Sequence, residues 1–160
     1  MQRIEKGARK AMYTRIMIST DGSELGGKGV DHGLALAKAL GVPATIVTVT
    51  ERFPVYSGGI GMDLAWSDAA VDEWDANQKA SADAILAAAG EAARRAGVAA
   101  DLVHVSEANI GEALIAAAQK HGADLIVMAS HGRRGLGRLV LGSKTSEVLS
   151  HSQIPVLVVR

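Results

Sequence analysis

The stretch DLIVMASHGRRGLGRLVLGSK, residues 124–144, carries the strongest structural signal in the chain. It begins with the most apolar run of the sequence, over 124–129, which predicts a buried strand. A glycine-rich segment follows, and a helix is predicted over 143–151. From residue 129 to 144 there are four glycines, four basic residues and no acidic residue. Glycines let successive amides point inward, and a helix N-terminus favours phosphate, so this stretch predicts an anion-binding loop.

Outward from this stretch, apolar strands and helical patterns alternate along the chain. We predict strands over 13–20, 43–50, 101–105, 124–129 and 155–159, and helices over 24–40, 69–96, 111–121 and 143–151. Mostly apolar strands that alternate with helices indicate a parallel sheet covered on both faces. At 160 residues the chain fits one domain. The predicted fold class is therefore α/β, a single Rossmann-like doubly wound domain over 13–160, after a poorly ordered N-terminal extension over 1–12 and with a long connection over 52–68.

Two strand ends carry unusual chemistry. In an open parallel sheet, ligands bind at the carboxyl ends of the strands where the strand order reverses. The first strand ends in Asp21-Gly22-Ser23, and the fourth leads into the glycine-rich stretch. Ser143 is expected either to cap the last helix or to donate its hydroxyl to a phosphate. Three plainer interpretations stay open: Asp21 as a helix cap, His131 as a turn residue, and the glycine-rich stretch as a solvated surface loop.

At these residues the chain resembles the universal stress protein family. The resemblance is carried by TDGSE at 20–24, MASHGRRGLGRLVLGS at 128–143 and PVLVV at 155–159, and it covers 13–160. ATP-binding members of that family have a glycine, two residues, a glycine, nine residues, and a glycine followed by Ser or Thr. Gly132 and Gly142-Ser143 match this pattern, whereas Ala129 replaces the first glycine.

The resemblance implies a five-stranded parallel sheet in the order 3-2-1-4-5, so that the first and fourth strands are neighbours. It also implies that Asp21 contacts ribose or adenine and that the backbone of Val49 reaches the base. The nucleotide-binding residues that it implies are Ser19, Thr20, Asp21, Val49, Met128, Ala129, His131, Gly132, Arg133, Gly142, Ser143 and Lys144. The implied ligand is ATP, or AMP or ADP, with or without Mg²⁺. The last strand, 155–159, resembles the family's dimerisation edge, so we expect a homodimer.

Composition argues against several other functions. Lys+Arg and Asp+Glu both number 17, so no overall field attracts nucleic acid or an anionic membrane. Aromatic residues make up 3%, too few for a platform that stacks single-stranded bases. There are no cysteines, and the five histidines lack metal-ligand spacing, so no protein-bound metal is expected. No apolar run is long enough to span a membrane, and we expect a cytoplasmic protein.

The sequence indicates binding rather than turnover. We find no general base with an orienting partner, which efficient hydrolysis requires, and we assign no catalytic residue. The resemblance implies a stress-response or regulatory protein, and we expect an unidentified protein partner to recognise its nucleotide-bound form. Two alternatives remain open: a slow ATPase or phosphotransferase that uses His131 or Asp21, and a family member that binds no nucleotide, which the Ala129 substitution keeps open.

Overall fold

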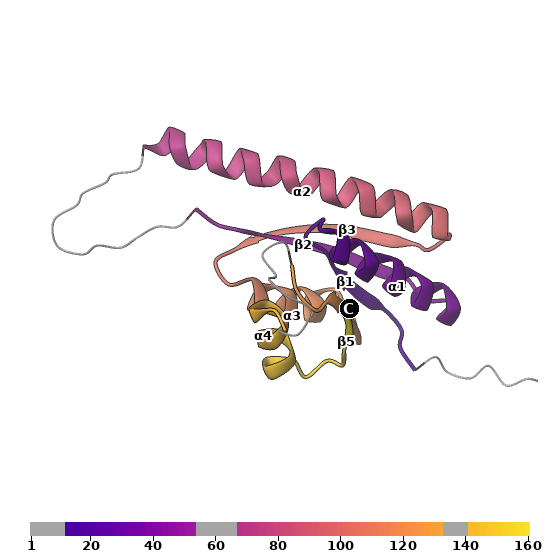
Figure 1. Ribbon diagram of the computed structural model, residues 1–160. Helices are drawn as coiled ribbons and strands as arrows, with labels where there is room; N and C mark the ends of the chain where they lie inside the picture. Colours follow the sequence, from indigo (N-terminus) through magenta and orange to yellow (C-terminus); the bar gives the residue numbers. More distant parts are fainter. Residues whose placement is uncertain (1–11, 54–66, 133–140) are drawn as a thin grey trace, which may run out of the picture.

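The computed structural model describes residues 12–53, 67–132 and 141–160 (Figure 1). The predicted extension up to residue 11, most of the connection and Arg133 lie outside the described residues. In chain order the elements are β1 (Ile16–Ser19), α1 (Glu24–Leu40), β2 (Ala44–Glu51), α2 (Asp68–Ala96), β3 (Ala100–Glu107), α3 (Ile110–Lys120), β4 (Leu125–Ala129), α4 (Ser143–His151) and β5 (Val156–Val159). All the strand pairs are parallel and their order is β3-β2-β1-β4-β5, which confirms the predicted sheet.

Helices cover both faces of the sheet, as the sequence predicted. Residues of alternating parity on each strand point to opposite faces. Ile16 and Ile18 pack with α1 and α2 on one face, whereas Met17 packs with α3 and α4 on the other. Figure 1 shows α2 lying along one side of the sheet, with α3 and α4 on the opposite side. None of the helices described in the structure is long and apolar enough to cross a membrane.

Glycines shape helix α1 rather than only weakening it. Glycine costs up to about 1 kcal/mol relative to alanine inside a helix. An ideal Cβ built on Gly33 would lie only 2.6 Å from two side-chain atoms of Ile18, so this glycine lets α1 approach β1 closely. The helix ends at Gly41, whose φ of 68° is the left-handed conformation that glycine adopts without strain.

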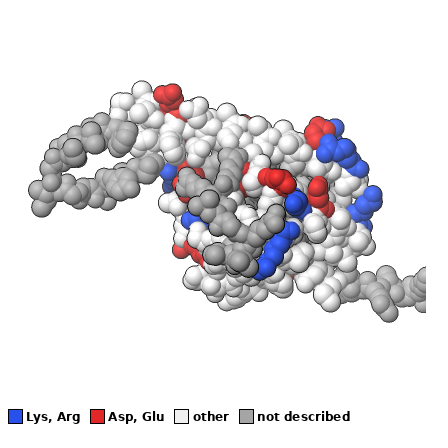
Figure 2. All heavy atoms as spheres, in the orientation of Figure 1, with Lys and Arg blue, Asp and Glu red and all other residues white. Residues whose placement is uncertain are grey.

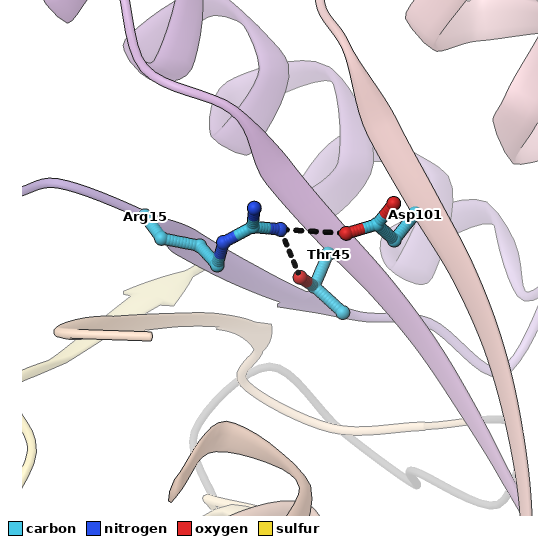
Figure 3. A network of polar contacts seen from close by, with 3 residues as sticks. All are labelled: Arg15, Thr45 and Asp101. Atoms are coloured by element: carbon cyan, nitrogen blue, oxygen red, sulfur yellow. Dashed lines mark hydrogen bonds and ion pairs between the residues drawn. The ribbon is translucent and has the colours of Figure 1, made fainter. Parts of the chain in front are cut away.

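A polar network holds the amino ends of the strands together. The Arg15 guanidinium donates to Thr45 Oγ1 at 3.1 Å and to Asp101 Oδ2 at 2.7 Å (Figure 3). These three residues precede or begin β1, β2 and β3. On the other side of β1, the Asp124 carboxylate accepts hydrogen bonds from the backbone amides of Thr14 and Arg15 and from the Thr14 hydroxyl. The network lies at the edge of the sheet opposite the carboxyl ends of the strands, and its role is structural.

Burial and hydrogen bonding both act on the ionisation of Asp124. Burial opposes its ionisation, but the hydrogen bonds from Thr14 and Arg15 outweigh burial and place the pKa of Asp124 below its ordinary value of 3.8. A carboxyl whose pKa is depressed in the folded state stabilises the fold fully above the unfolded-state pKa. The stabilisation is lost as the pH falls through the folded-state pKa.

We therefore expect Asp124→Asn to lower the free energy of unfolding by about 1 kcal/mol near pH 7, a modest value because the site is partly exposed. The difference from wild type should disappear as the pH falls below 3.8. Urea denaturation of the wild type and of Asp124→Asn, from pH 7 to below pH 3.8, measures this difference in the free energy of unfolding. Asp83→Asn is the control, because Asp83 forms an exposed ion pair with Lys79. A difference between wild type and Asp124→Asn that stays constant with pH would contradict this account.

Candidate functional site

The two strand ends that the sequence singled out meet in space. β1 pairs directly with β4, with Ile18 beside Val127. Just beyond these strands, an ideal Cβ on Gly132 would lie 2.6 Å from Asp21 Oδ2. The residues after β1 and after β4 are therefore in contact, at the position where the strand order reverses. This is the position at which open parallel sheets bind ligands.

Two adjoining hollows open at this edge of the sheet. The first hollow has a volume of about 160 Å³ and the second of about 420 Å³. Eleven of the twelve predicted site residues line one hollow or both, and the twelfth, Arg133, lies outside the described residues. The first hollow is lined by Ser19, Thr20, Met128 and Ala129, the second by Gly142 and Ser143, and both by Asp21, Val49, His131, Gly132 and Lys144. The structure thus brings the predicted residues together.

The first hollow is mainly apolar. Val47 and Val49 of β2 line it from the sheet, and Ile110 and Leu114 line it from the first turns of α3. Ile110 and Leu114 were not among the predicted site residues, although their spacing of four residues places them on one face of a helix. An apolar lining of this kind suits a ring such as a nucleobase.

Asp21 occupies a space that two glycines leave open. Its Oδ1 accepts a hydrogen bond from the Ser23 amide at 3.0 Å. An ideal Cβ on Gly26 would lie 2.7 Å from Oδ1, and one on Gly132 would lie 2.6 Å from Oδ2. The residue that caps α1 is Ser23, whose hydroxyl accepts from the Gly26 amide at 3.0 Å, so the interpretation of Asp21 as the helix cap is wrong.

Helix α4 begins at Ser143, as predicted, but its capping differs from the expectation. Gly142 is the N-cap and no side chain caps the helix, so of the two alternatives for Ser143 the capping role is wrong. The Gly142 amide donates to Ser130 O at 2.8 Å. Amides in the first turn of a helix have no acceptor within the helix. This applies to the amides of Ser143 and Lys144, and both residues line the second hollow. Thr145, which the sequence did not single out, donates to Ala129 O at 2.9 Å and ties α4 to β4.

Ala129, which replaces the first glycine of the family pattern, causes no backbone strain. Among the described residues every positive φ belongs to a glycine, so Ala129 has a conformation open to any residue. Its neighbour Met128 packs on the α3 and α4 face, and alternation along β4 places the Ala129 side chain on the opposite face. The extra methyl group therefore points away from the apolar side of the first hollow.

The titratable groups at the site are few. His131 lines both hollows and its Nδ1 lies 3.1 Å from Ser130 Oγ, a contact that suits a role in the turn as well as one toward a ligand. Over the described ranges, no three His, Asp or Glu side chains are grouped closely enough to hold a metal ion. On the face drawn in Figure 2, acidic and basic side chains are interspersed rather than gathered into one field.

Comparisons with known proteins extend over almost the entire chain. Residues 12–160 match the family model described as the universal stress protein family. The chain is 30% identical over 149 residues to the universal stress protein YxiE of Bacillus subtilis (strain 168), covering 93% of this chain and 100% of that protein. The universal stress protein UspA from Lactobacillus plantarum shares the fold with a TM-score of 0.80 and 21% identity, over 94% of this chain and 100% of that one. A universal stress protein in complex with cAMP aligns with a TM-score of 0.66 and 26% identity, over 92% of this chain and 97% of that one.

The contacts around Gly142 lead to a prediction about stability. A Cβ on Gly142 would lie 3.0 Å from His131 Cα and 3.2 Å from Ser130 O, so the backbone itself must shift. We expect Gly142→Ala to lower the free energy of unfolding by about 1–2 kcal/mol. Gly27→Ala is the matched control, because Gly27 is exposed in α1 and its Cβ would meet no atom within 4 Å. The control should raise stability by up to about 1 kcal/mol. Equal urea midpoints for the two variants would show that the turn before α4 accommodates a side chain.

Proposed function

Because the chain belongs to the universal stress protein family, we propose that it binds an adenine nucleotide and acts as a stress-response or regulatory protein in the cytoplasm. The ligand is ATP, or AMP or ADP, and an unidentified partner protein distinguishes the liganded chain from the free one. The observation that carries this proposal is the contact between Asp21 and Gly132 beside an apolar hollow and a helix N-terminus. The relative in complex with cAMP supports the same ligand class.

In the proposed complex the two hollows hold different parts of the ligand. The base lies in the first hollow, against Val49 and Ile110, and the Asp21 carboxylate accepts hydrogen bonds from the sugar. The phosphates lie at the start of α4, where the first-turn amides and the positive end of the helix dipole favour an anion. Lys144 adds a positive charge there. Mg²⁺, where it takes part, arrives with the nucleotide.

Binding rather than turnover is the proposed activity. Efficient hydrolysis needs a base held toward the attacking water by a second group. His131 Nδ1 is hydrogen-bonded to Oγ of the adjacent Ser130, within the turn. A steady-state ATPase rate near the enzyme median of about 10 per second would overturn this part of the proposal in favour of the enzymatic alternative.

Binding is tested by thermal unfolding with and without ATP. At 100 times its dissociation constant a ligand stabilises by about 2.7 kcal/mol, which for a domain of this size raises the melting temperature by roughly 5–10 °C. We expect this shift for the wild type and its loss in Asp21→Ala. Asp83→Ala, a carboxylate on the outer face of α2, should retain it. An unchanged melting temperature of the wild type at millimolar ATP would favour a family member that binds no nucleotide.

We also propose a homodimer that forms through β5. This strand lies at the edge of the sheet, beside β4. It consists of four apolar residues, and its Leu157 is 39% exposed. Leu149 on the adjacent α4 is 43% exposed. An apolar edge strand is a surface that a second strand can cover, since its outer backbone groups are available for pairing.

The dimer is tested by light scattering of Leu157→Lys. We expect the wild type to show twice the chain mass of 16.5 kDa and the variant to show the mass of one chain, because a charge at the centre of an apolar interface is not solvated. Leu102→Lys is the matched control: Leu102 is 45% exposed and lies on β3, at the opposite edge of the sheet. Loss of the dimer in both variants, or in neither, would contradict assembly through β5.

A further inference from the structure

Helix α2 extends well beyond the part that packs on the sheet. It has 29 residues, and its buried residues are Ala82, Leu86, Ala89 and Ala93. None of the side chains of 68–81 is buried, and Figure 1 shows the first turns of the helix reaching past the ends of the strands. It is nevertheless attached to the sheet, because Trp74 Nε1 and Gln78 Nε2 both donate to Glu51 O at 3.3 Å. The end of β2 therefore holds this part of α2 in place.

The same part of α2 forms a wall of the second hollow. Gln78, Ser81 and Ile85 are spaced by three and four residues, which places them on one face of the helix, and all three line the hollow. Ser143 and Lys144 at the start of α4 line it as well. The last residues of β2 line it from the sheet: Thr48, Val49, Thr50 and Glu51.

The two hollows are joined where the sugar is proposed to lie. Asp21, Gly132 and Lys144 line both of them. A group attached to the sugar that leaves the first hollow therefore enters the second. In the proposed complex one phosphate lies at the start of α4, and the outer phosphates of a triphosphate extend across the second hollow toward its α2 wall. The volume of about 420 Å³ is large enough for this longer chain.

We propose that Gln78 and Ser81 are specificity-determining residues that favour a nucleoside triphosphate over a monophosphate. This inference rests on the proposed function of the site. A side-chain amide carries two donor hydrogens, so Gln78 keeps its bond to Glu51 O and donates the second to an outer phosphate oxygen. The Ser81 hydroxyl supplies another donor. Hydrogen bonds to a charged acceptor are about twice as strong as neutral ones, so two such donors select for the charge that only the longer chain places there.

The test is calorimetric titration of the purified full chain with ATP and with AMP, both with Mg²⁺ present. We expect the double variant Gln78→Ala/Ser81→Ala to bind ATP about tenfold more weakly and AMP within about twofold of the wild type. Asn77→Ala is the matched control, since it removes an exposed amide from the adjacent position of α2, outside the hollow. It should leave both affinities unchanged. Ser81→Ala alone, which keeps the contacts of Gln78 with Glu51, should show a smaller loss for ATP only.

The possible outcomes separate this inference from the function on which it rests. A wild type that binds both nucleotides, with an ATP to AMP affinity ratio that the double variant leaves unchanged, overturns the role of α2 and leaves nucleotide binding intact. Equal weakening toward ATP and AMP also overturns it, because the substitutions then act on the site as a whole. A wild type that binds neither nucleotide overturns both proposals.

Discussion

The position of the Asp21 carboxylate depends on two glycines, because an ideal Cβ would lie 2.7 Å from its Oδ1 at Gly26 and 2.6 Å from its Oδ2 at Gly132. Gly26 lies in the first turn of α1 and Gly132 follows β4, so one carboxylate sets how closely three segments approach each other. The contact is possible because β1 and β4 are neighbours in the sheet. A carboxylate oxygen can rotate away from a new methyl group, whereas the backbone contact at Gly142 cannot. The two glycines of the family pattern therefore serve different purposes: Gly132 makes space for the Asp21 side chain, and Gly142 makes space for the chain itself.

The polar interactions of the sheet are divided between its two ends. At the amino ends, Arg15 donates to Thr45 of β2 and to Asp101 of β3. Asp124, which directly precedes β4, accepts from the Arg15 amide just before β1. Polar groups with good partners stabilise a fold but leave little capacity for a ligand. At the carboxyl ends the first-turn amides of α4 lie beside a hollow instead, whereas the Thr48 hydroxyl donates to Thr20 O and the Thr50 hydroxyl is hydrogen-bonded to His104 Nε2. The donors available at this edge therefore come from the start of α4 rather than from the hydroxyls of β2.

The sequence predicted the order and type of every element, because long apolar runs and glycine stops report on local structure. Helix α4 was predicted with its observed bounds. Strand β1 begins at Ile16 rather than at residue 13, since Thr14 and Arg15 donate to the Asp124 side chain instead of to a neighbouring strand. The strand order came from the family resemblance. Capping of α4 by Ser143, one of the two predictions for that residue, was wrong, because the cap depends on backbone geometry at a single residue, here Gly142. Ile110, Gln78 and Ser81 were not predicted, since their place at the site depends on packing between distant elements.

Strand β2 explains why one site contains two environments. Val47 lines only the first hollow, Thr48 and Thr50 line only the second, and Val49 lines both. The period of two along the strand thereby gives the two hollows different side chains from the same strand. The residues of the family pattern lie after β4 and at the start of α4, whereas the far wall of the second hollow comes from α2. A wall outside the shared pattern can change without disturbing the contact between Asp21 and Gly132, so the choice among related ligands is most readily made there.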